Sequence, residues 1–408
     1  MSHLVTRPRH SIINQAFESK LRFPSARPLN ADGFGIGWYD PVLAGQPSLL
    51  LAGEEDSTPA TPQPTSPQIA ATAVADAKVA SGQVDPTLRT DTPSPLDAGT
   101  GGVSACVNGA VSPVADDDQT EAERVASVRH LRKREREEED ERPCVFKSIS
   151  PAWSNANLLR LAEKIRSPLI FAHVRASTMS GAPSEDNCHP WVFDRLMWMH
   201  NGEINEFPRI KRALQAALPE ELFLFPAGYT DAEWAFMVFL SHLRDPHAKH
   251  FSHAELRDAM MKTIRTINDL SKEAGITGPS LMNFVVSDGH TVIATRYISS
   301  RTSEASSLFF SSGTSFDEYD PGEGMYRMTK ADKRERIIMV ASEPLTFESK
   351  DWIEVKTNTM VVITPNIPII DEYWVSPQDP AAHHRDPEFA IQSGYGLGFN
   401  YNRSAIAA

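Results

Sequence analysis

The sequence predicts a layered α+β protein. Its folded parts alternate apolar, strand-like segments with amphipathic helical segments in blocks. Two of the apolar segments flank Asp288-Gly289, the dipeptide expected of a tight hairpin turn. Because the strands follow one another in hairpin order and the helices are grouped between them, a layered α+β fold is favoured over a doubly wound parallel sheet.

The predicted elements are justified by their residue patterns. Strands are predicted where apolar and β-branched residues run between turn residues, at 168–177, 196–202, 281–298, 307–313, 336–345 and 352–365. Helices are predicted at 154–165, 230–243 and 252–275. The last two open with Thr230 and Glu233, and with Ser252 and Glu255, which is the spacing of a capping box.

Composition limits the class of protein. The chain has 408 residues, 41% of them hydrophobic, and a formal net charge of -13. This acidic balance argues against nucleic acid or an anionic membrane surface as the main partner. No apolar stretch approaches the ~18 residues needed to span a bilayer, so we expect a soluble, cytoplasmic protein. The three cysteines lack CxxC spacing and predict neither a disulfide framework nor a zinc site, and we expect no cofactor.

The composition changes inside the chain. Residues 43–143 are rich in Pro, Ser, Thr, Ala and Gly and have too few large apolar groups for a core, so a disordered insertion is predicted. Its end, "RHLRKREREEED", mixes both charges; a localisation or nucleic-acid signal is the less favoured interpretation, because the acids cancel the positive field. The expected organisation is therefore one domain over 1–375, this insertion within it, and a tail over 376–408.

Four residues are candidates for a site. Arg175 ends an apolar strand, where its guanidinium suits a carboxylate, although a surface strand-end arginine is an equal alternative. Asn201 and Gly202, in "MHNGEI", offer a side-chain and a backbone N–H that together could form an oxyanion hole; the alternative is an ordinary Asn-Gly turn. Asp231 begins a helix, as an acid favoured by the helix dipole or as a carboxylate for an ammonium group.

Two further motifs are interpreted structurally. In "NCHPW", Cys188 and His189 are adjacent, so their side chains point in opposite directions on an extended chain, and Cys188 is predicted to be a packed thiol and not a nucleophile. "NADGFGIGWY", residues 30–39, has glycines at alternate positions and is not a dinucleotide fingerprint. It suits a turn where backbone passes close to another group, and a hairpin bend is the favoured interpretation.

Taken together and in this order, the motifs "NADGFGIGWY", "AHVRAST", "NCHPW", "MHNGEI" and "TDAE" resemble the type 2 glutamine amidotransferase family. The resemblance implies a four-layer αββα N-terminal-nucleophile fold. It further implies that Arg175 binds the substrate α-carboxylate with Thr178 nearby, that Asp231 binds the α-ammonium, and that Asn201 and Gly202 form the oxyanion hole. The opening "TRPRHSIINQ" is similar to a branch that cleaves the γ-glutamyl bond of glutathione together with a peptidase-like partner subunit.

The family nucleophile is an N-terminal cysteine whose own α-amine serves as base. This chain begins Met1-Ser2-His3, has no cysteine before Cys106, and is expected to lack the first strand as well as the nucleophilic Cys. Three hypotheses follow. The protein is an active γ-glutamyl hydrolase whose start lies upstream, or a catalytically inactive γ-glutamyl-binding or scaffolding subunit, or a glutaminase that supplies ammonia to a separate synthase. Mass spectrometry of the N-terminal peptide separates the first from the second.

Overall fold

The computed structural model describes residues 1–15, 32–40, 68–73, 142–175, 183–320, 322–331, 336–346, 348–365, 368–371 and 388–389. These residues belong to one compact unit, formed by residues 1–79 and 139–408. The helices are α1 (Ser2–Val5), α2 (Ile12–Gln15), α4 (Ala156–Lys164), α5 (Phe207–Ala216), α6 (Glu220–Leu224), α7 (Asp231–Ser241) and α8 (His253–Glu273). Short 3₁₀ turns are η2 (Ala152–Ser154), η3 (Glu185–Asn187) and η4 (Ser349–Asp351).

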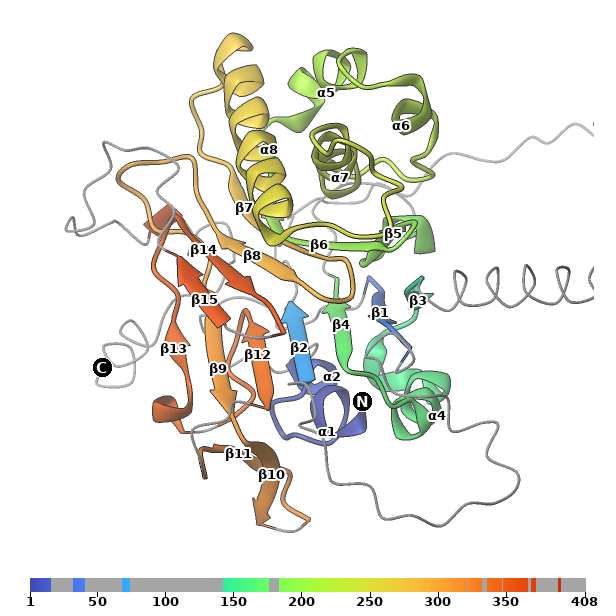
Figure 1. Ribbon diagram of the computed structural model, residues 1–408, viewed down its shortest axis with the longest axis vertical. Helices are drawn as coiled ribbons and strands as arrows, with labels where there is room; N and C mark the ends of the chain where they lie inside the picture. The colour runs from blue at the N-terminus through green and yellow to red at the C-terminus, as the bar shows by residue number, and fades with distance from the viewer. Residues whose placement is uncertain are drawn as a thin grey trace, which may run out of the picture. The chain divides into compact units, whose positions relative to one another are not determined.

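The described strands form two large sheets and one small one (Figure 1). The seven-stranded sheet has the order β13 (Ile353–Glu354), β9 (Phe309–Gly313), β12 (Ile337–Ala341), β2 (Gln68–Ala73), β4 (Leu169–Val174), β1 (Phe34–Trp38) and β3 (Cys144–Ser148). The six-stranded sheet has the order β15 (Pro368–Asp371), β14 (Thr359–Ile363), β8 (Val292–Arg296), β7 (Leu281–Ser287), β6 (Leu196–Glu203) and β5 (Trp191–Phe193). The small sheet pairs β10 (Ser315–Asp320) with β11 (Met325–Thr329).

Three apolar clusters hold these elements together. The largest joins α5, α7 and α8 to one face of the six-stranded sheet, with Trp198 of β6 and Phe236 of α7 stacked at its centre. A second joins the two large sheets, and includes Phe171 of β4 and Met199 of β6. The third packs α1, α2 and α4 on strands β1 and β4, through residues such as Val5 and Leu158. Helices and sheets therefore bury their apolar faces against one another, as a layered protein requires.

The α+β prediction is confirmed, and most predicted elements are present. Thr230 caps α7 by accepting from the Glu233 backbone N–H at 3.4 Å, and Ser252 caps α8 by accepting from Glu255 N–H at 3.1 Å. The sequence did not predict the helices α1, α2, α5 and α6 or the strands β3, β5, β10, β11 and β15. No helix in the part of the chain that the structure describes is long and apolar enough to cross a membrane.

Residues 34–38 form a strand, so the hairpin-bend interpretation of "GFGIGW" is wrong. Strand β1 pairs with β3 on one side and β4 on the other. The close approach that the glycines suggested is present, because a Cβ at Gly35 would overlap the carbonyl oxygen of His189. At Gly33, whose φ is +115°, a Cβ would lie 2.8 Å from the Cys188 sulfur. The glycines let β1 pass directly beneath the segment that carries Cys188 and His189.

Strand β2 was not predicted, since residues 68–73 fall within the stretch 43–143 that composition indicates to be disordered. It lies between β12 and β4 and is parallel to both. Two flanking strands supply a backbone ladder on each side, and this tertiary context outweighs the weak strand signal of an alanine-rich hexamer. The rest of the predicted insertion up to residue 141, and nearly all of the tail 376–408, lie outside the described residues.

Candidate active site

Asn201 and Gly202 lie in the second half of strand β6, and so not in a turn as the simpler interpretation had them. Asn201 is buried and pairs across the ladder with Asn283 of β7. Its Nδ2 donates to the Ser342 hydroxyl at 2.6 Å. Its Oδ1 is buried and has no hydrogen-bond partner among the described residues. Oδ1 can only accept, so the group that this amide can offer to a ligand oxygen is the second hydrogen of Nδ2.

The packing around position 202 requires a glycine. Its φ is +154°, and a Cβ there would overlap the Leu281 carbonyl oxygen and lie 2.8 Å from Nε2 of His200. Any side chain at this position would displace the neighbouring strand β7. A bare backbone beside the Asn201 amide is therefore imposed by packing against Leu281 and His200.

Asp231 is linked directly to the end of β6. It is the first residue of α7, and its Oδ2 accepts a hydrogen bond from the Ile204 backbone N–H at 2.8 Å. Ile204 follows Gly202 by two residues, so the carboxylate and the Asn-Gly pair are held at the same strand end. The structure thus brings Asp231, Asn201 and Gly202 together.

Arg175 is buried directly after β4. Its backbone N–H donates to the Gly33 carbonyl at 2.9 Å, and its own carbonyl accepts from the Asp32 N–H at 3.2 Å, which fixes the chain at this strand end. The surface-arginine alternative is therefore wrong. Thr178, the other residue expected to contact the α-carboxylate, lies outside the described residues.

Three buried histidines connect Arg175 to Asp231, and sequence reasoning did not single them out as a group. The rings of His173 and His189 are 3.9 Å apart, and Nδ1 of His189 accepts from the His200 backbone N–H at 3.5 Å. Burial lowers the pKa of all three, and that of His173 falls to about 3. Neutral imidazoles therefore line this region at physiological pH.

Two charged groups, Arg175 and Asp231, change the pKa values of these histidines. After burial, the Arg175 guanidinium is the largest cause that lowers the pKa of His173, while the Asp231 carboxylate raises the pKa of His200. A permanent cation therefore acts at one end of the histidine cluster and a carboxylate at the other. An opposite pair of charges separated by neutral groups matches the α-carboxylate and α-ammonium of an amino acid.

Glu233 is a second group that sequence reasoning gave only a capping role. It is 3% exposed, and its carboxylate accepts from the backbone N–H groups of Ala227 and Gly228. Burial raises its pKa to about 7; the two N–H groups and Lys147 oppose this shift and Asp186 adds to it. Glu233 thus fixes the segment that leads into α7 and Asp231.

Cys188 is a packed thiol, as predicted. It is fully buried, and its Sγ donates to the carbonyl oxygens of Ser148 at 3.8 Å and Ser184 at 3.6 Å. Burial raises its pKa, whereas a nucleophile needs a lowered one. Among the described residues, no group of three or more His, Cys, Asp and Glu is arranged to hold a metal ion.

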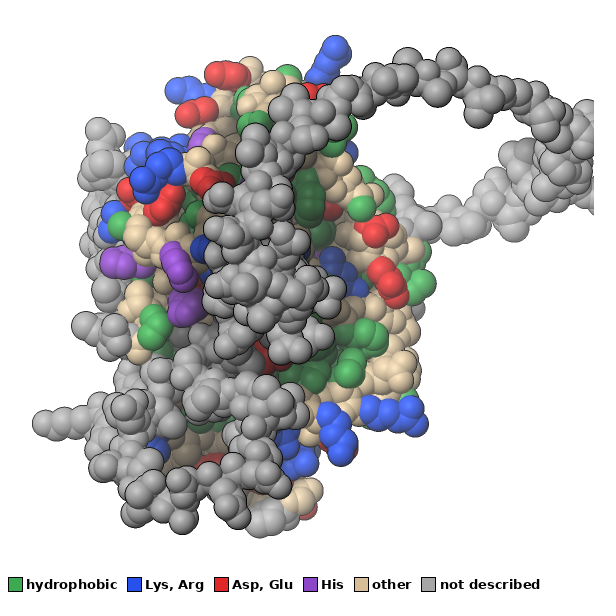
Figure 2. Space-filling view, turned by 45° about the vertical axis from the view of Figure 1, so that its right-hand side comes forward, with side chains coloured by type: hydrophobic (Ala, Val, Ile, Leu, Met, Phe, Trp, Pro, Cys, Tyr) green, Lys and Arg blue, Asp and Glu red, His purple; other side chains and the backbone are tan. Residues whose placement is uncertain are grey.

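The surface and the pocket add two facts. On the face shown in Figure 2, acidic and basic side chains are interspersed over the described surface. A pocket of about 720 Å³ lies near the start of β7, lined by residues such as Lys272 and Ser303 and by none of the candidate site residues. The candidate site is therefore defined by its buried polar groups.

Comparison with known proteins shows the family of this chain. The family described as "Glutamine amidotransferases class-II" matches residues 137–369. The chain is also 39% identical over 388 residues to "Probable glutamine amidotransferase DUG3" of Saccharomyces cerevisiae, covering 92% of this chain and 82% of the yeast protein. This chain therefore belongs to the class-II glutamine amidotransferases.

Two solved structures are similar in part. A glutamine aminotransferase class-II domain protein from Silicibacter pomeroyi is 24% identical, with a TM-score of 0.43 over 58% of this chain and 88% of that chain. The glutamine phosphoribosylpyrophosphate amidotransferase of B. subtilis is 15% identical, with a TM-score of 0.35 over 58% of this chain and 41% of that chain.

Proposed function

We propose that this protein is a glutamine amidotransferase-like hydrolase that cleaves a γ-glutamyl amide bond, that of glutathione, with a peptidase-like partner subunit. It would use the four-layer αββα arrangement of the N-terminal-nucleophile enzymes. The observation that carries the proposal is the bond from the Ile204 N–H to Asp231 Oδ2, which holds this carboxylate two residues after Asn201 and Gly202, together with the burial of Arg175 directly after strand β4. Family membership supports the reaction class, and the choice of glutathione rests on sequence resemblance.

The site residues then divide substrate binding and catalysis among them. Arg175 binds the α-carboxylate of the γ-glutamyl group, and Asp231 uses its second carboxylate oxygen for the α-ammonium while Oδ2 remains on Ile204. These two contacts place the γ-carbonyl beside Asn201 and Gly202. Attack by the family's N-terminal thiolate produces a negatively charged oxygen, which the Asn201 Nδ2 and the Gly202 N–H stabilise. One such donor is typically worth about 100-fold to 1000-fold in turnover.

The test uses protein purified from its own cells. Glutamate release is measured with glutathione, glutamine and a γ-glutamyl dipeptide, together with mass spectrometry of the N-terminal peptide. Release from glutathione in preference to glutamine, with a mature N-terminal cysteine, is the expected result. Binding of glutathione without release would instead make the protein a binding subunit. Preferential release from glutamine would make it a glutaminase that supplies ammonia.

Site variants test the residue roles. Asn201→Ala should lower turnover about 100-fold or more with little change in KM, because its donor acts on charge that develops in the transition state. Arg175→Lys should raise KM, because a point charge replaces a planar fork. Asn268→Ala is the matched control, since it removes an amide that bonds to the Tyr297 hydroxyl at 2.7 Å from helix α8. An active enzyme indifferent to Asn201→Ala would refute the oxyanion assignment.

A further inference from the structure

Two asparagines that face each other across strands β6 and β7 bridge the two large sheets. Asn201 and Asn283 are paired in the ladder, so their side chains point to the same face. Asn201 donates to the Ser342 hydroxyl, directly after β12. Asn283 donates to the Ser306 carbonyl at 3.1 Å, in the segment that precedes β9. Each amide is thus anchored to a segment that adjoins a strand of the opposite sheet.

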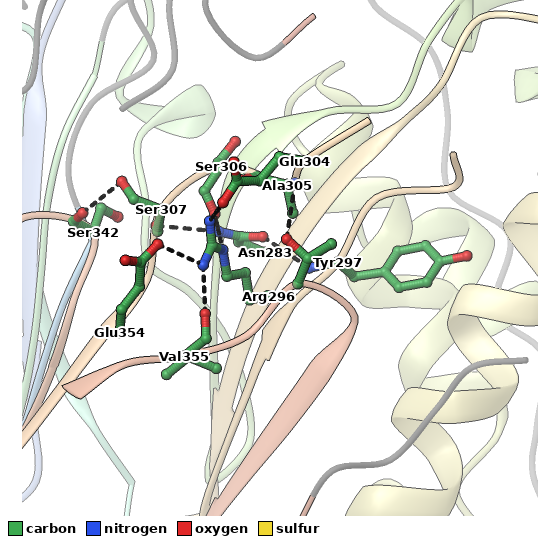
Figure 3. Close-up of polar contacts among 11 residues, drawn as sticks. Asn283, Arg296, Tyr297, Glu304, Ala305, Ser306, Ser307, Ser342, Glu354 and Val355 are labelled. Carbon is green, nitrogen blue, oxygen red and sulfur yellow. Dashed lines mark hydrogen bonds and ion pairs between the residues drawn. The ribbon is translucent and has the colours of Figure 1, made fainter. Parts of the chain in front are cut away.

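The two anchor points are also joined to each other. The Ser307 hydroxyl donates to the Ser342 carbonyl at 2.9 Å, and Asn283 also reaches the Ser307 carbonyl at 3.5 Å (Figure 3). Ser342, Ser307 and both asparagines are buried. A chain of contacts therefore runs from Asn201 through Ser342 and Ser307 to Asn283.

Arg296 of strand β8 fixes the segment 304–307 that takes part in these contacts. It is 2% exposed, its Nε donates to the Ser306 carbonyl at 2.9 Å, and its guanidinium forms ion pairs of 2.9 Å with Glu304 and Glu354 (Figure 3). Its Nη2 also donates to the Ala305 carbonyl at 3.1 Å. The segment 304–307 is thereby fixed by charge-assisted bonds to the buried Arg296. Through the Ser307 hydroxyl, which donates to the Ser342 carbonyl, it also holds the backbone of the Asn201 partner.

We propose that Ser342 is a positioning residue for the oxyanion hole, an inference that rests on the proposed function. The terminal torsion of an asparagine is soft, so packing and hydrogen bonds must fix the amide plane. Nδ2 carries two hydrogens, and the bond to Ser342 uses one. The other remains for the oxygen of the substrate. Without the hydroxyl, the amide loses the contact that defines its orientation, while the binding groups Arg175 and Asp231 are unchanged.

The proposal predicts a specific kinetic pattern. Ser342→Ala should lower kcat on the order of tenfold, less than the loss caused by Asn201→Ala, because the donor is retained but no longer oriented. KM should change less than twofold. In the Asn201→Ala background, Ser342→Ala should have no further effect on kcat, because a positioning residue acts only through the group that it positions.

The experiment is a double-mutant cycle on γ-glutamyl hydrolysis, with the variants made in the protein's own cells. Ser311→Ala is the matched control. Ser311 is a buried serine of strand β9, and its hydroxyl donates to the Asp351 carbonyl at 2.6 Å. Additive losses in the double variant, or equal losses in Ser342→Ala and Ser311→Ala, would overturn the positioning role. Absence of hydrolysis in the wild-type protein would instead refute the proposed function itself.

A second measurement does not depend on turnover. The Asn201 side-chain amide signals, assigned by their loss in Asn201→Ala, should exchange with solvent faster and shift position in Ser342→Ala. The Asn283 amide signals should change little, because their acceptors are backbone carbonyls of segment 306–307. Unchanged Asn201 signals in Ser342→Ala would overturn the inference even if the enzyme is active.

Discussion

Glu233→Gln should change how the stability of the protein depends on pH. In the folded protein, burial raises the pKa of this carboxyl from its ordinary value of 4.5 to about 7. Folding therefore favours the protonated form. The stabilisation that this form contributes is complete below pH 4.5, declines as the pH rises through 7, and is absent above it. Glutamine does not titrate and keeps one oxygen for the N–H groups of Ala227 and Gly228.

The size of the effect follows from the pKa. A change from 4.5 to about 7 corresponds to about 3 kcal/mol of unfolding free energy. Relative to Glu233→Gln, the wild-type protein should thus lose about 3 kcal/mol between pH 4 and pH 8. Lys147 and Asp186 also act on this carboxyl with opposite signs, and both remain in the variant.

Urea unfolding followed by tryptophan fluorescence, at several pH values with a common m-value, measures this difference. The control is Glu255→Gln, which removes a carboxylate at the corresponding capping position of α8. The change of unfolding free energy with pH could instead be no larger for Glu233→Gln than for the control. That result would refute the interpretation that burial destabilises the ionised Glu233 carboxylate.

Three further perturbations test other parts of the structure. Gly202→Ala should destabilise the fold by about 1 to 3 kcal/mol in urea unfolding, since its Cβ would overlap the Leu281 carbonyl; an unchanged midpoint would contradict the close approach. Alkylation followed by mass spectrometry should modify the exposed Cys144 well before the buried Cys188, and equal rates would contradict the packed-thiol interpretation. Arg296→Met should cost about 3 kcal/mol in unfolding free energy, because Glu304 and Glu354 lose their common cation; a loss below about 1 kcal/mol would contradict the buried network.

The elements that could be predicted are those marked by local sequence signals. The capping residues Thr230 and Ser252 mark the helices α7 and α8 because their hydroxyls act within one turn. The residues Arg175, Asn201 and Asp231 were found because several short motifs occur in a fixed order. Strand β2 could not be predicted, because its ladder partners are about 100 and 270 positions away along the chain.

The surroundings and pKa values of the buried ionisable groups could also not be predicted from the sequence. His173, His189 and His200 come from three different segments, and only folding places their rings together. The raised pKa of Glu233 depends on burial, which a capping motif does not reveal. Ser342 has no sequence signal as a partner of Asn201, because the two are separated by 141 positions and brought together only when the two sheets pack.

The bond between Asp231 and the Ile204 backbone has a consequence for how this protein can evolve or be redesigned. The carboxylate proposed to select the substrate also fixes the strand that carries Asn201 and Gly202. A substitution at position 231 would therefore also disturb the end of strand β6, which carries the proposed oxyanion hole. If Asp231 has the proposed role, selectivity and turnover depend on the same side chain, and a new substrate preference would have to arise at positions that leave this bond intact.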